Sequence, residues 1–350
     1  MAHPATPSAA PSGPPRPLYA KLGRRVAIAT ALILLGMIPT LILYGITKES
    51  ATTWATAASI AGITAVWVGG VEVAVMTAFV MALLTPVAIV AGSTPITGAA
   101  LMAIMCLVVG RMSRFGLDRA TLLVPIFMAW MIIDPPFWGP QHTVDRLDGT
   151  YLGWMAVTFF AGAIVPVLVL PFALRKVHLP PPKSHTRREA LPYTVTIIVL
   201  ASASTFLVLQ HPKETAGAWL IATILVLTQV GDVGTVRRTI ERVVGTVLGM
   251  VVVGVIVLRV DSLVLIYVIG LVFAIAAVTA KFSPNYWLYM ALITPTVVCL
   301  NAASSTEVAN LGEQRAVDTF AGAGLVLLAS AITIGYAHWS NRSGPAPASL

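Results

Sequence analysis

The sequence predicts an all-α protein that crosses a membrane many times. Of its 350 residues, 57% are hydrophobic and only 10% are charged, whereas a soluble domain carries about 25% charged residues. The hydrophobic residues are grouped into long runs separated by short polar segments, and a membrane-spanning helix needs about 20 consecutive apolar residues. These observations indicate a polytopic membrane protein rather than a soluble one.

The apolar runs fall into two groups of six, and each run predicts one helix. The first group covers approximately residues 26–45, 52–69, 71–91, 96–110, 120–134 and 151–174. The second group covers approximately residues 190–209, 216–230, 243–258, 262–280, 285–300 and 318–337. We therefore expect about twelve transmembrane helices.

Polar segments divide the chain into two membrane halves. Residues 1–20 are rich in proline and are expected to be a disordered tail. A basic linker at 175–189, expected in the cytoplasm, separates a first half at 21–174 from a second half at 190–338, and residues 339–350 form a C-terminal tail.

Matching positions suggest that the two halves arose by duplication. Trp54 and Trp219 each open the second run of their group, and Glu72 and Glu241 are each followed five residues later by a threonine. Six helices in each half would make the two repeats parallel, which in transporters places the substrate site between the halves near the middle of the membrane.

The basic residues predict the orientation in the membrane. With the N-terminus in the cytoplasm, 17 of the 22 Lys and Arg residues lie in cytoplasmic segments, whereas Arg146 and Arg315 are among the few in outer segments. This excess follows the positive-inside rule. We therefore expect a bacterial inner-membrane protein with both termini cytoplasmic. Because orientation accounts for the net charge of +8, we expect no nucleic-acid partner.

The strongest candidate binding site is the basic sequence that leads into the ninth run. Arg238 and Arg242 are four residues apart, so they share one face of a helix. An arginine side chain binds a carboxylate through two parallel hydrogen bonds. We predict that Arg238 and Arg242 bind an organic anion and that Glu241 orients them. The alternative is a row of charges that only sets the orientation of the helix.

The same stretch then predicts close helix packing. Gly245 and Gly249 are four residues apart and Thr246 lies between them. Small residues at this spacing allow a neighbouring membrane helix to approach closely. We predict one continuous helix that begins in the basic segment and packs tightly inside the membrane.

Two carboxylates are candidates for proton coupling or gating. Glu72 lies at a short turn near the inner face of the membrane, and Asp318 opens the last apolar run. For both residues the alternative is a structural role, in particular the capping of a helix N-terminus.

Other motifs narrow the function. Five aromatic residues line a path for an aromatic substrate or form a belt at the membrane interface: Trp54, Trp219, Tyr286, Trp287 and Tyr289. The sequence carries no motif for zinc, nucleotide phosphates or a serine nucleophile. We therefore expect no enzymatic activity, no metal and no cofactor.

The pattern R-R-x-x-E-R-x-x-G-T-x-x-G, from Arg237 to Gly249, resembles the signature of the fusaric acid resistance family. Relatives of that family include the aromatic acid exporters and the plant malate-type anion channels. The resemblance extends over about residues 190–337, through Trp219 in GAWLIATILVLTQ and through R-x-x-D-T-x-x-G, which starts at Arg315. The first half resembles the family only in layout. The resemblance implies export of aromatic or other organic acids, driven by the proton gradient.

We therefore expect a transporter that exports small organic, mainly aromatic, acid anions from the cytoplasm. One alternative is an anion channel of similar architecture. Another is a membrane subunit that transports nothing itself and belongs to an envelope export assembly. Expected partners are the lipid bilayer, the anion, and either a membrane-fusion protein or further copies of the chain.

Overall fold

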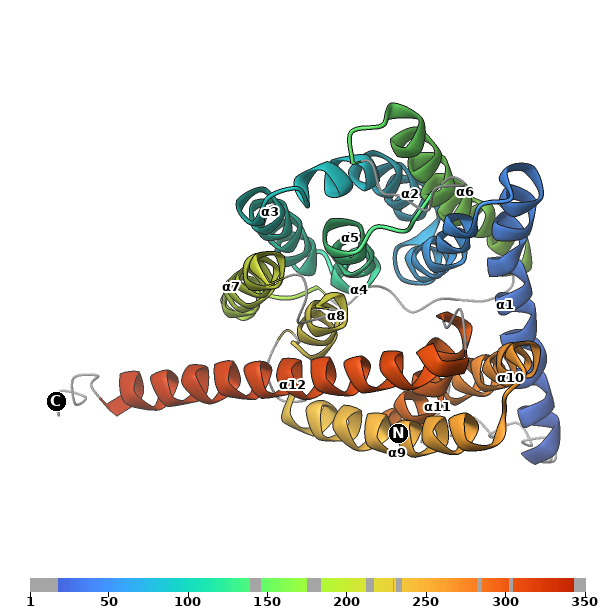
Figure 1. The fold of residues 1–350 in the computed structure, drawn as a ribbon. Helices are drawn as coiled ribbons and strands as arrows, with labels where there is room; N and C mark the ends of the chain where they lie inside the picture. Colours follow the sequence, from blue (N-terminus) through green and yellow to red (C-terminus); the bar gives the residue numbers. More distant parts are fainter. Residues whose placement is uncertain are drawn as a thin grey trace, which may run out of the picture.

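The computed structural model describes the backbone of residues 18–138, 146–174, 184–211, 217–228, 230, 235–281, 285–301 and 305–342. Over these residues the chain is helical (Figure 1), apart from a short 3-10 turn at Ser50–Thr53 and connecting loops. The helices of the first half are α1 (Leu18–Thr47), α2 (Trp54–Ala91), α3 (Pro95–Ser113), α4 (Asp118–Thr121), α5 (Leu123–Ile133) and α6 (Gly149–Leu174). Those of the second half are α7 (Arg187–Gln210), α8 (Ala218–Leu227), α9 (Thr235–Arg259), α10 (Leu263–Lys281), α11 (Tyr286–Asn301) and α12 (Ser305–Arg342).

The helices are those of a multi-pass membrane protein, as predicted. Among the described residues, eight helices are long and apolar enough to cross a membrane. The helices α8 and α11 are apolar but shorter, and α5 has only 11 residues. The predicted count of twelve spans is not confirmed, because three runs form short helices and two runs are combined in α2. Residues 1–17 of the predicted tail, much of the linker and the last eight residues lie outside the described part of the chain. Helix α1 begins at Leu18, inside the predicted N-terminal tail, and α12 continues to Arg342, inside the predicted C-terminal tail.

The second and third predicted runs meet at Gly70, where the backbone leaves helical geometry with φ 79° and ψ −172°. Glycine adopts a positive φ without a steric penalty. Both ends of α2 contact the last turn of α5: the Trp54 ring meets Trp130, and Gly92 lies against the carbonyl of Ile132. A straight helix of 38 residues would be about 57 Å long, so α2 must fold back at Gly70.

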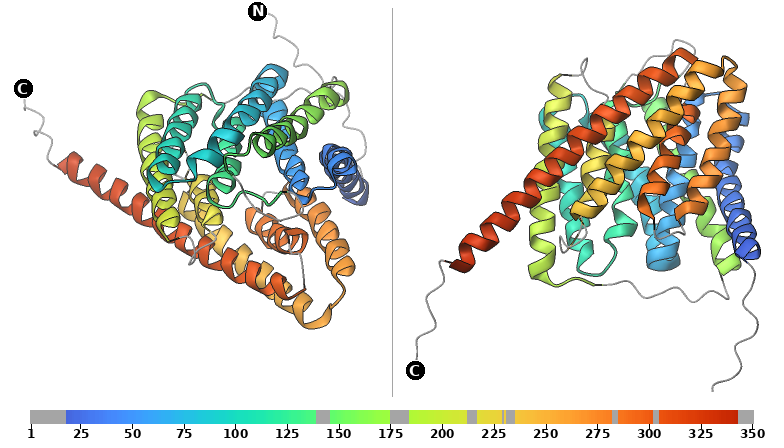
Figure 2. Two further views of the ribbon diagram at one scale, coloured as in Figure 1. Left: turned by 45° about the horizontal axis from the view of Figure 1, so that its top comes forward. Right: turned by 90° about the horizontal axis from the view of Figure 1, so that it is seen from below.

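The two halves are not separate bodies. In Figure 1, α7 and α8 lie beside α3 and α5 of the first half, and α1 lies beside α10, in agreement with the contacts between these helices. The largest buried cluster joins side chains of both halves, among them Met81, Met128 and Phe159 with Ile197 and Ile221. Helix α11 packs against α9, α10 and α12, and α12 also packs against α9. Figure 2 shows α12 crossing the bundle obliquely and projecting past it at its C-terminal end.

Arg146 holds the C-terminal ends of two helices. Its guanidinium donates to the carbonyl of Ile89 at 2.7 Å and to the carbonyls of Ile132 and Ile133 at 3.1 and 3.5 Å. These are carbonyls of the last turns of α2 and α5, which have no partner within their own helices. Burial lowers the pKa of Arg146, and the nearby Asp134 opposes that change. The end of α5 is therefore fixed against α2.

Helix α9 includes both the basic segment and the apolar run, so the predicted continuous helix is observed. Gly245 and Gly249 both face α11. A Cβ atom at Gly245 would overlap the backbone at Trp287, and one at Gly249 would lie 2.8 Å from the carbonyl oxygen of Ala291 and 2.6 Å from the Cβ of Thr294. The two glycines therefore allow α9 and α11 to pack at backbone distance.

Replacing Gly249 with leucine should separate these two helices. The new side chain has no space beside Ala291, and over-packing of this kind costs about 1–3 kcal/mol. We expect the thermal unfolding temperature of the purified protein to fall. Gly254→Leu is the matched control on the same helix, because no atom lies within 4 Å of the Cβ position at Gly254. Equal unfolding temperatures for the two variants would show that Gly249 does not form the contact.

Candidate anion-binding site

The first component of the site is Arg242 in the second turn of α9, with a side chain only 5% exposed. Its Nη2 donates to the hydroxyl oxygen of Thr223 on α8 at 3.0 Å. Its Nη1 lies 3.5 Å from the hydroxyl oxygen of Tyr286 and 3.6 Å from the sulfur of Met290, both on α11. The guanidinium therefore lies where α8, α9 and α11 meet.

The second component is Arg315 on α12, which is also 5% exposed. Its guanidinium carbon lies 4.2 Å from the centre of the Trp219 ring on α8. A guanidinium over an indole face is stabilised by the charge distribution of the ring. The prediction that Arg315 lies in an outer loop is wrong, because α12 begins at Ser305 and already contains it.

Asp318 lies on the same helix and is 4% exposed. Its carboxylate lies close to the backbone N–H of Leu220, in the first turn of α8. The first four N–H groups of a helix have no partner within it, and Gly217 at the N-terminus of α8 provides no side-chain cap. The capping role considered for Asp318 would therefore concern α8 rather than its own helix. The expectation that Asp318 opens the last helix is wrong.

Further along α12, Gly322 completes the contact with α8. A Cβ atom there would lie 2.8 Å from a methyl carbon of Thr223 and 3.2 Å from the carbonyl oxygen of Leu220. Successive residues of α12 therefore meet successive residues of α8. Arg315 lies against the Trp219 ring, Asp318 lies near the backbone N–H of Leu220, and Gly322 packs against Thr223. Helix α12 thereby holds α8 in position beneath Arg315.

The site contains positive charge that the described residues do not neutralise. Arg242 and Arg315 are close enough to interact electrostatically, and Tyr289 is close to both. The Nε of Arg242 and the Nε and Nη1 of Arg315 are buried without a hydrogen-bond partner, as is the Oδ2 of Asp318. Each such group costs about 1–3 kcal/mol, and more when it is charged. A bound anion would supply the acceptors that the guanidinium groups lack.

The other arginines of the basic segment lie closer to the surface. Arg238 is partly exposed, and its guanidinium lies 5.6 Å from the centre of the Tyr286 ring. Arg237 is 80% exposed and forms an ion pair with Glu241 at 2.7 Å. Glu241 therefore pairs with Arg237. This ion pair does not support the prediction that Glu241 orients Arg238 and Arg242.

The remaining predicted residues have different surroundings. Thr246 is 2% exposed and lies between the two packing glycines of α9. Glu72 is exposed, two residues after the reversal of α2 at Gly70. The burial that a proton-coupling carboxylate requires is therefore absent at Glu72. Within the described residues, no group of three or more His, Cys, Asp or Glu side chains is arranged to hold a metal ion.

Residues 193–329 match a family model described as fusaric acid resistance protein-like. This confirms the resemblance predicted for the second half. The match covers less than half of the chain and includes α8, α9 and the part of α12 that carries Arg315, Asp318 and Gly322. Comparison with curated proteins and with solved structures found no match. All the charged residues of the site thus lie in the fusaric acid resistance-like segment.

Sequence reasoning missed Arg315, Thr223 and Met290 as members of the site. A signal for Arg315 was present, because it opens the R-x-x-D-T-x-x-G pattern whose aspartate was selected as a candidate. In the sequence the apolar run begins at Asp318, so the sequence alone places Arg315 outside the helix. Thr223 and Met290 belong to no sequence motif, and they join the site only because the Arg242 guanidinium reaches them.

Substitution of Asp318 separates capping from charge. Asp318→Ala removes the acceptor for the Leu220 N–H, and loss of an N-cap costs about 0.5–2 kcal/mol, so the unfolding temperature should fall. Asp318→Asn keeps an acceptor oxygen and should remain close to the wild type. If Asp318→Asn is as unstable as Asp318→Ala, the charge of the carboxylate rather than the capping contact stabilises α8.

Proposed function

We propose that this protein exports small organic anions, mainly aromatic acids, and that the anion binds between Arg242 and Arg315. The family match and the apolar helices are consistent with a membrane transporter rather than an enzyme. The observation that carries the proposal is the set of three guanidinium nitrogens that are buried without an acceptor. Charged groups inside a membrane protein are costly and mark the path of a substrate or ion.

The surroundings of the two arginines support an aromatic acid as the substrate. Trp219 lies beneath Arg315, while Tyr286 and Tyr289 lie on the side of Arg242. A carboxylate held by the guanidinium groups would place an attached ring among these side chains. Aromatic rings pair favourably at centre-to-centre distances of 4.5–7 Å. The site thus offers one charged and one aromatic component.

A route from the cytoplasm to this site is part of the proposal. Arg238 lies one turn before Arg242 and contacts Tyr286, which also contacts Arg242. An anion attracted by Arg238 at the partly exposed end of α9 would therefore meet Arg242 next. The predicted inner-membrane orientation, with both termini in the cytoplasm, places this end of α9 at the cytoplasmic face.

We propose two alternatives for what drives transport: coupling to the proton gradient, or passive conduction through an anion channel. Asp318 is buried with one oxygen unpartnered, which supports proton coupling, whereas the exposed Glu72 does not. The proximity of Asp318 to the Leu220 N–H favours the second alternative, an anion channel, because it gives the carboxylate a structural role. Transport by Asp318→Asn that no longer responds to a pH gradient would support coupling. Unchanged transport that follows the membrane potential would support the channel.

We also keep the predicted duplication as a proposal, supported by one pair of contacts. Gly162 on α6 packs against Ala55 and Ala58, and Gly322 on α12 packs against Leu220 and Thr223. If Trp54 is aligned with Trp219, these partners become equivalent positions. Aligning Gly162 with Gly322 in turn places Met155 opposite Arg315 and Thr158 opposite Asp318, so one chain would carry one anion site. A non-transporting subunit that binds a membrane-fusion protein or another copy of the chain remains the third candidate.

Arg242→Lys should weaken transport while keeping the positive charge. Lysine cannot reproduce the planar pair of donors, and loss of a charge-assisted contact is worth about 1.5–3 kcal/mol, or about 10- to 150-fold in apparent affinity. The measurement is uptake of labelled benzoate, a simple aromatic carboxylate, into inverted membrane vesicles at several concentrations.

Arg237→Lys is the matched control for this experiment, because Arg237 is on the same helix and is 80% exposed. It should transport like the wild type. If both variants transport benzoate with wild-type affinity, Arg242 only sets the orientation of α9 and the proposed site is lost. Protein amount and membrane insertion must be equal in all samples.

The orientation is tested at Ser184, which is exposed just before α7. The proposal places this residue in the cytoplasm. A Ser184→Cys variant should therefore react with a membrane-impermeant maleimide only after the cells are opened. Its two native cysteines, Cys106 and Cys299, are buried and provide the unlabelled background in the parent protein. Efficient labelling in intact cells would reverse the proposed topology.

A further inference from the structure

The Trp219 side chain, which lies against Arg315, also contacts the first half of the chain. The Trp219 ring meets the Trp130 ring on α5 nearly edge to face, with centres 4.7 Å apart and planes at 85°. Aromatic rings favour this arrangement, which is worth more than the burial of their area alone. Trp130 lies outside residues 193–329, the segment that matches the family model.

Trp130 is itself held in place from two sides. Its other ring contact is Trp54 at 5.9 Å, and Trp54 stacks on Phe159 of α6 at 6.3 Å. The turn of α5 that carries Trp130 ends at the carbonyls of Ile132 and Ile133, which Arg146 holds. The position of Trp130 is therefore set by α2, α6 and the Arg146 contacts of the first half.

We propose that Trp130 is a positioning residue of the anion site, because it fixes the Trp219 ring beneath Arg315 and so aims the guanidinium. This inference rests on the proposed function and extends it across the boundary between the halves. Arg315 has two buried nitrogens without acceptors, so its direction depends on the ring on which it lies. If Trp219 could turn, the unpaired guanidinium would lose the surface that orients it.

The proposal gives the first half a specific part in recognition. The charged residues come from α9 and α12, whereas the ring that orients one of them is held by α5. In transporters built from repeats, the substrate site lies at the interface between the repeats. The row of rings from Phe159 through Trp54 and Trp130 to Trp219 is a contact between the halves, since it connects α6 to Arg315.

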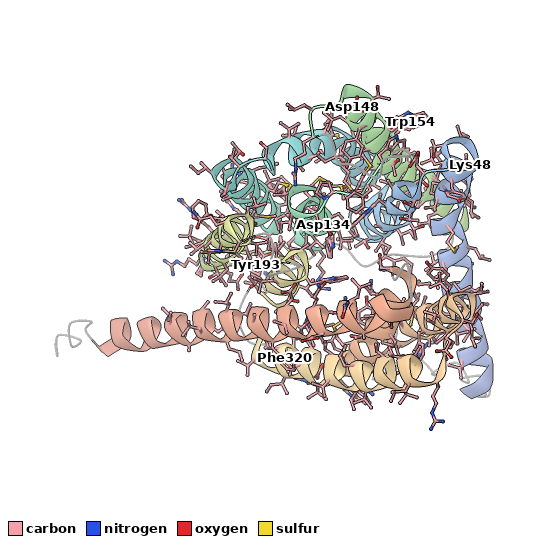
Figure 3. All side chains as sticks on the ribbon, in the orientation of Figure 1. Lys48, Asp134, Asp148, Trp154, Tyr193 and Phe320 are labelled. Carbon is pink, nitrogen blue, oxygen red and sulfur yellow. The ribbon has the colours of Figure 1, made fainter. Side chains whose placement is uncertain are left out.

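The test is benzoate transport by Trp130→Leu, Trp130→Phe and Trp154→Leu. Trp130→Leu should raise the half-saturating benzoate concentration about 2- to 10-fold with little change in the maximal rate. Trp130→Phe keeps a ring at this position and should recover most of the affinity. Trp154→Leu is the control, because Trp154 on α6 stacks with Trp138 and lies at the opposite edge of the bundle from α12 (Figure 3).

A double substitution shows whether Trp130 acts through Trp219. In a Trp219→Leu background, adding Trp130→Leu should cause no further loss of affinity, because the ring that Trp130 positions is already absent. Multiplying effects would overturn the proposal, since they would show that Trp130 acts independently of Trp219. Equal affinity for Trp130→Leu and the wild type would overturn it as well.

A measurement without substrate separates this inference from the proposed function. The tryptophan bands of the near-ultraviolet circular dichroism spectrum report the packing of the indole rings. Trp130→Leu and Trp219→Leu should each change these bands, and the change in the double variant should be smaller than the sum of the two single changes, because both single variants remove the same Trp130–Trp219 ring pair. Additive changes would overturn the positioning role even if benzoate is transported. Absence of benzoate transport by the wild-type protein would contradict the proposed function alone.

Discussion

The burial of two guanidinium groups beside α8 is the constraint on which the rest of the site depends. Arg242 reaches α8 from α9, and Arg315 reaches it from α12. Like charges in a medium of low dielectric repel each other strongly, so the surrounding residues must offset that repulsion. Thr223 supplies a hydroxyl oxygen and Trp219 supplies the negative face of a ring. Three buried guanidinium nitrogens still lack hydrogen-bond acceptors, and they are the basis of the anion-binding proposal.

Close packing makes this arrangement possible. The glycines of α9 let α11 approach Arg242 with Tyr286 and Met290, and Gly322 lets α12 approach α8. Lipid tails are as apolar as leucine, so membrane helices gain little from burying apolar surface against each other and associate mainly through packing and hydrogen bonds. The small residues therefore hold α9 against α11 and α12 against α8.

The two halves have unequal parts in this site. The second half supplies the charges, and the first half supplies the aromatic support that begins at Trp130. Under the proposed duplication, with Gly162 aligned with Gly322, the first-half positions equivalent to Arg315 and Asp318 would be Met155 and Thr158, which carry no charge. The extensive contact of α7 with α3, and of α1 with α10, means that neither half is packed without the other.

The sequence by itself determined the membrane class, the helical character of the apolar runs and the continuity of α9, because apolar length and composition are local properties. It also indicated Arg242 and Asp318 as candidate site residues, because a charged side chain beside a long apolar run is costly to bury. Only the tertiary structure decided that Arg242 lies near Arg315, 73 residues later, that Asp318 lies beside the first turn of α8, and that Glu241 pairs with Arg237. These outcomes depend on which helix faces which and on where long side chains end. Periodicity and spacing along one chain contain neither kind of information.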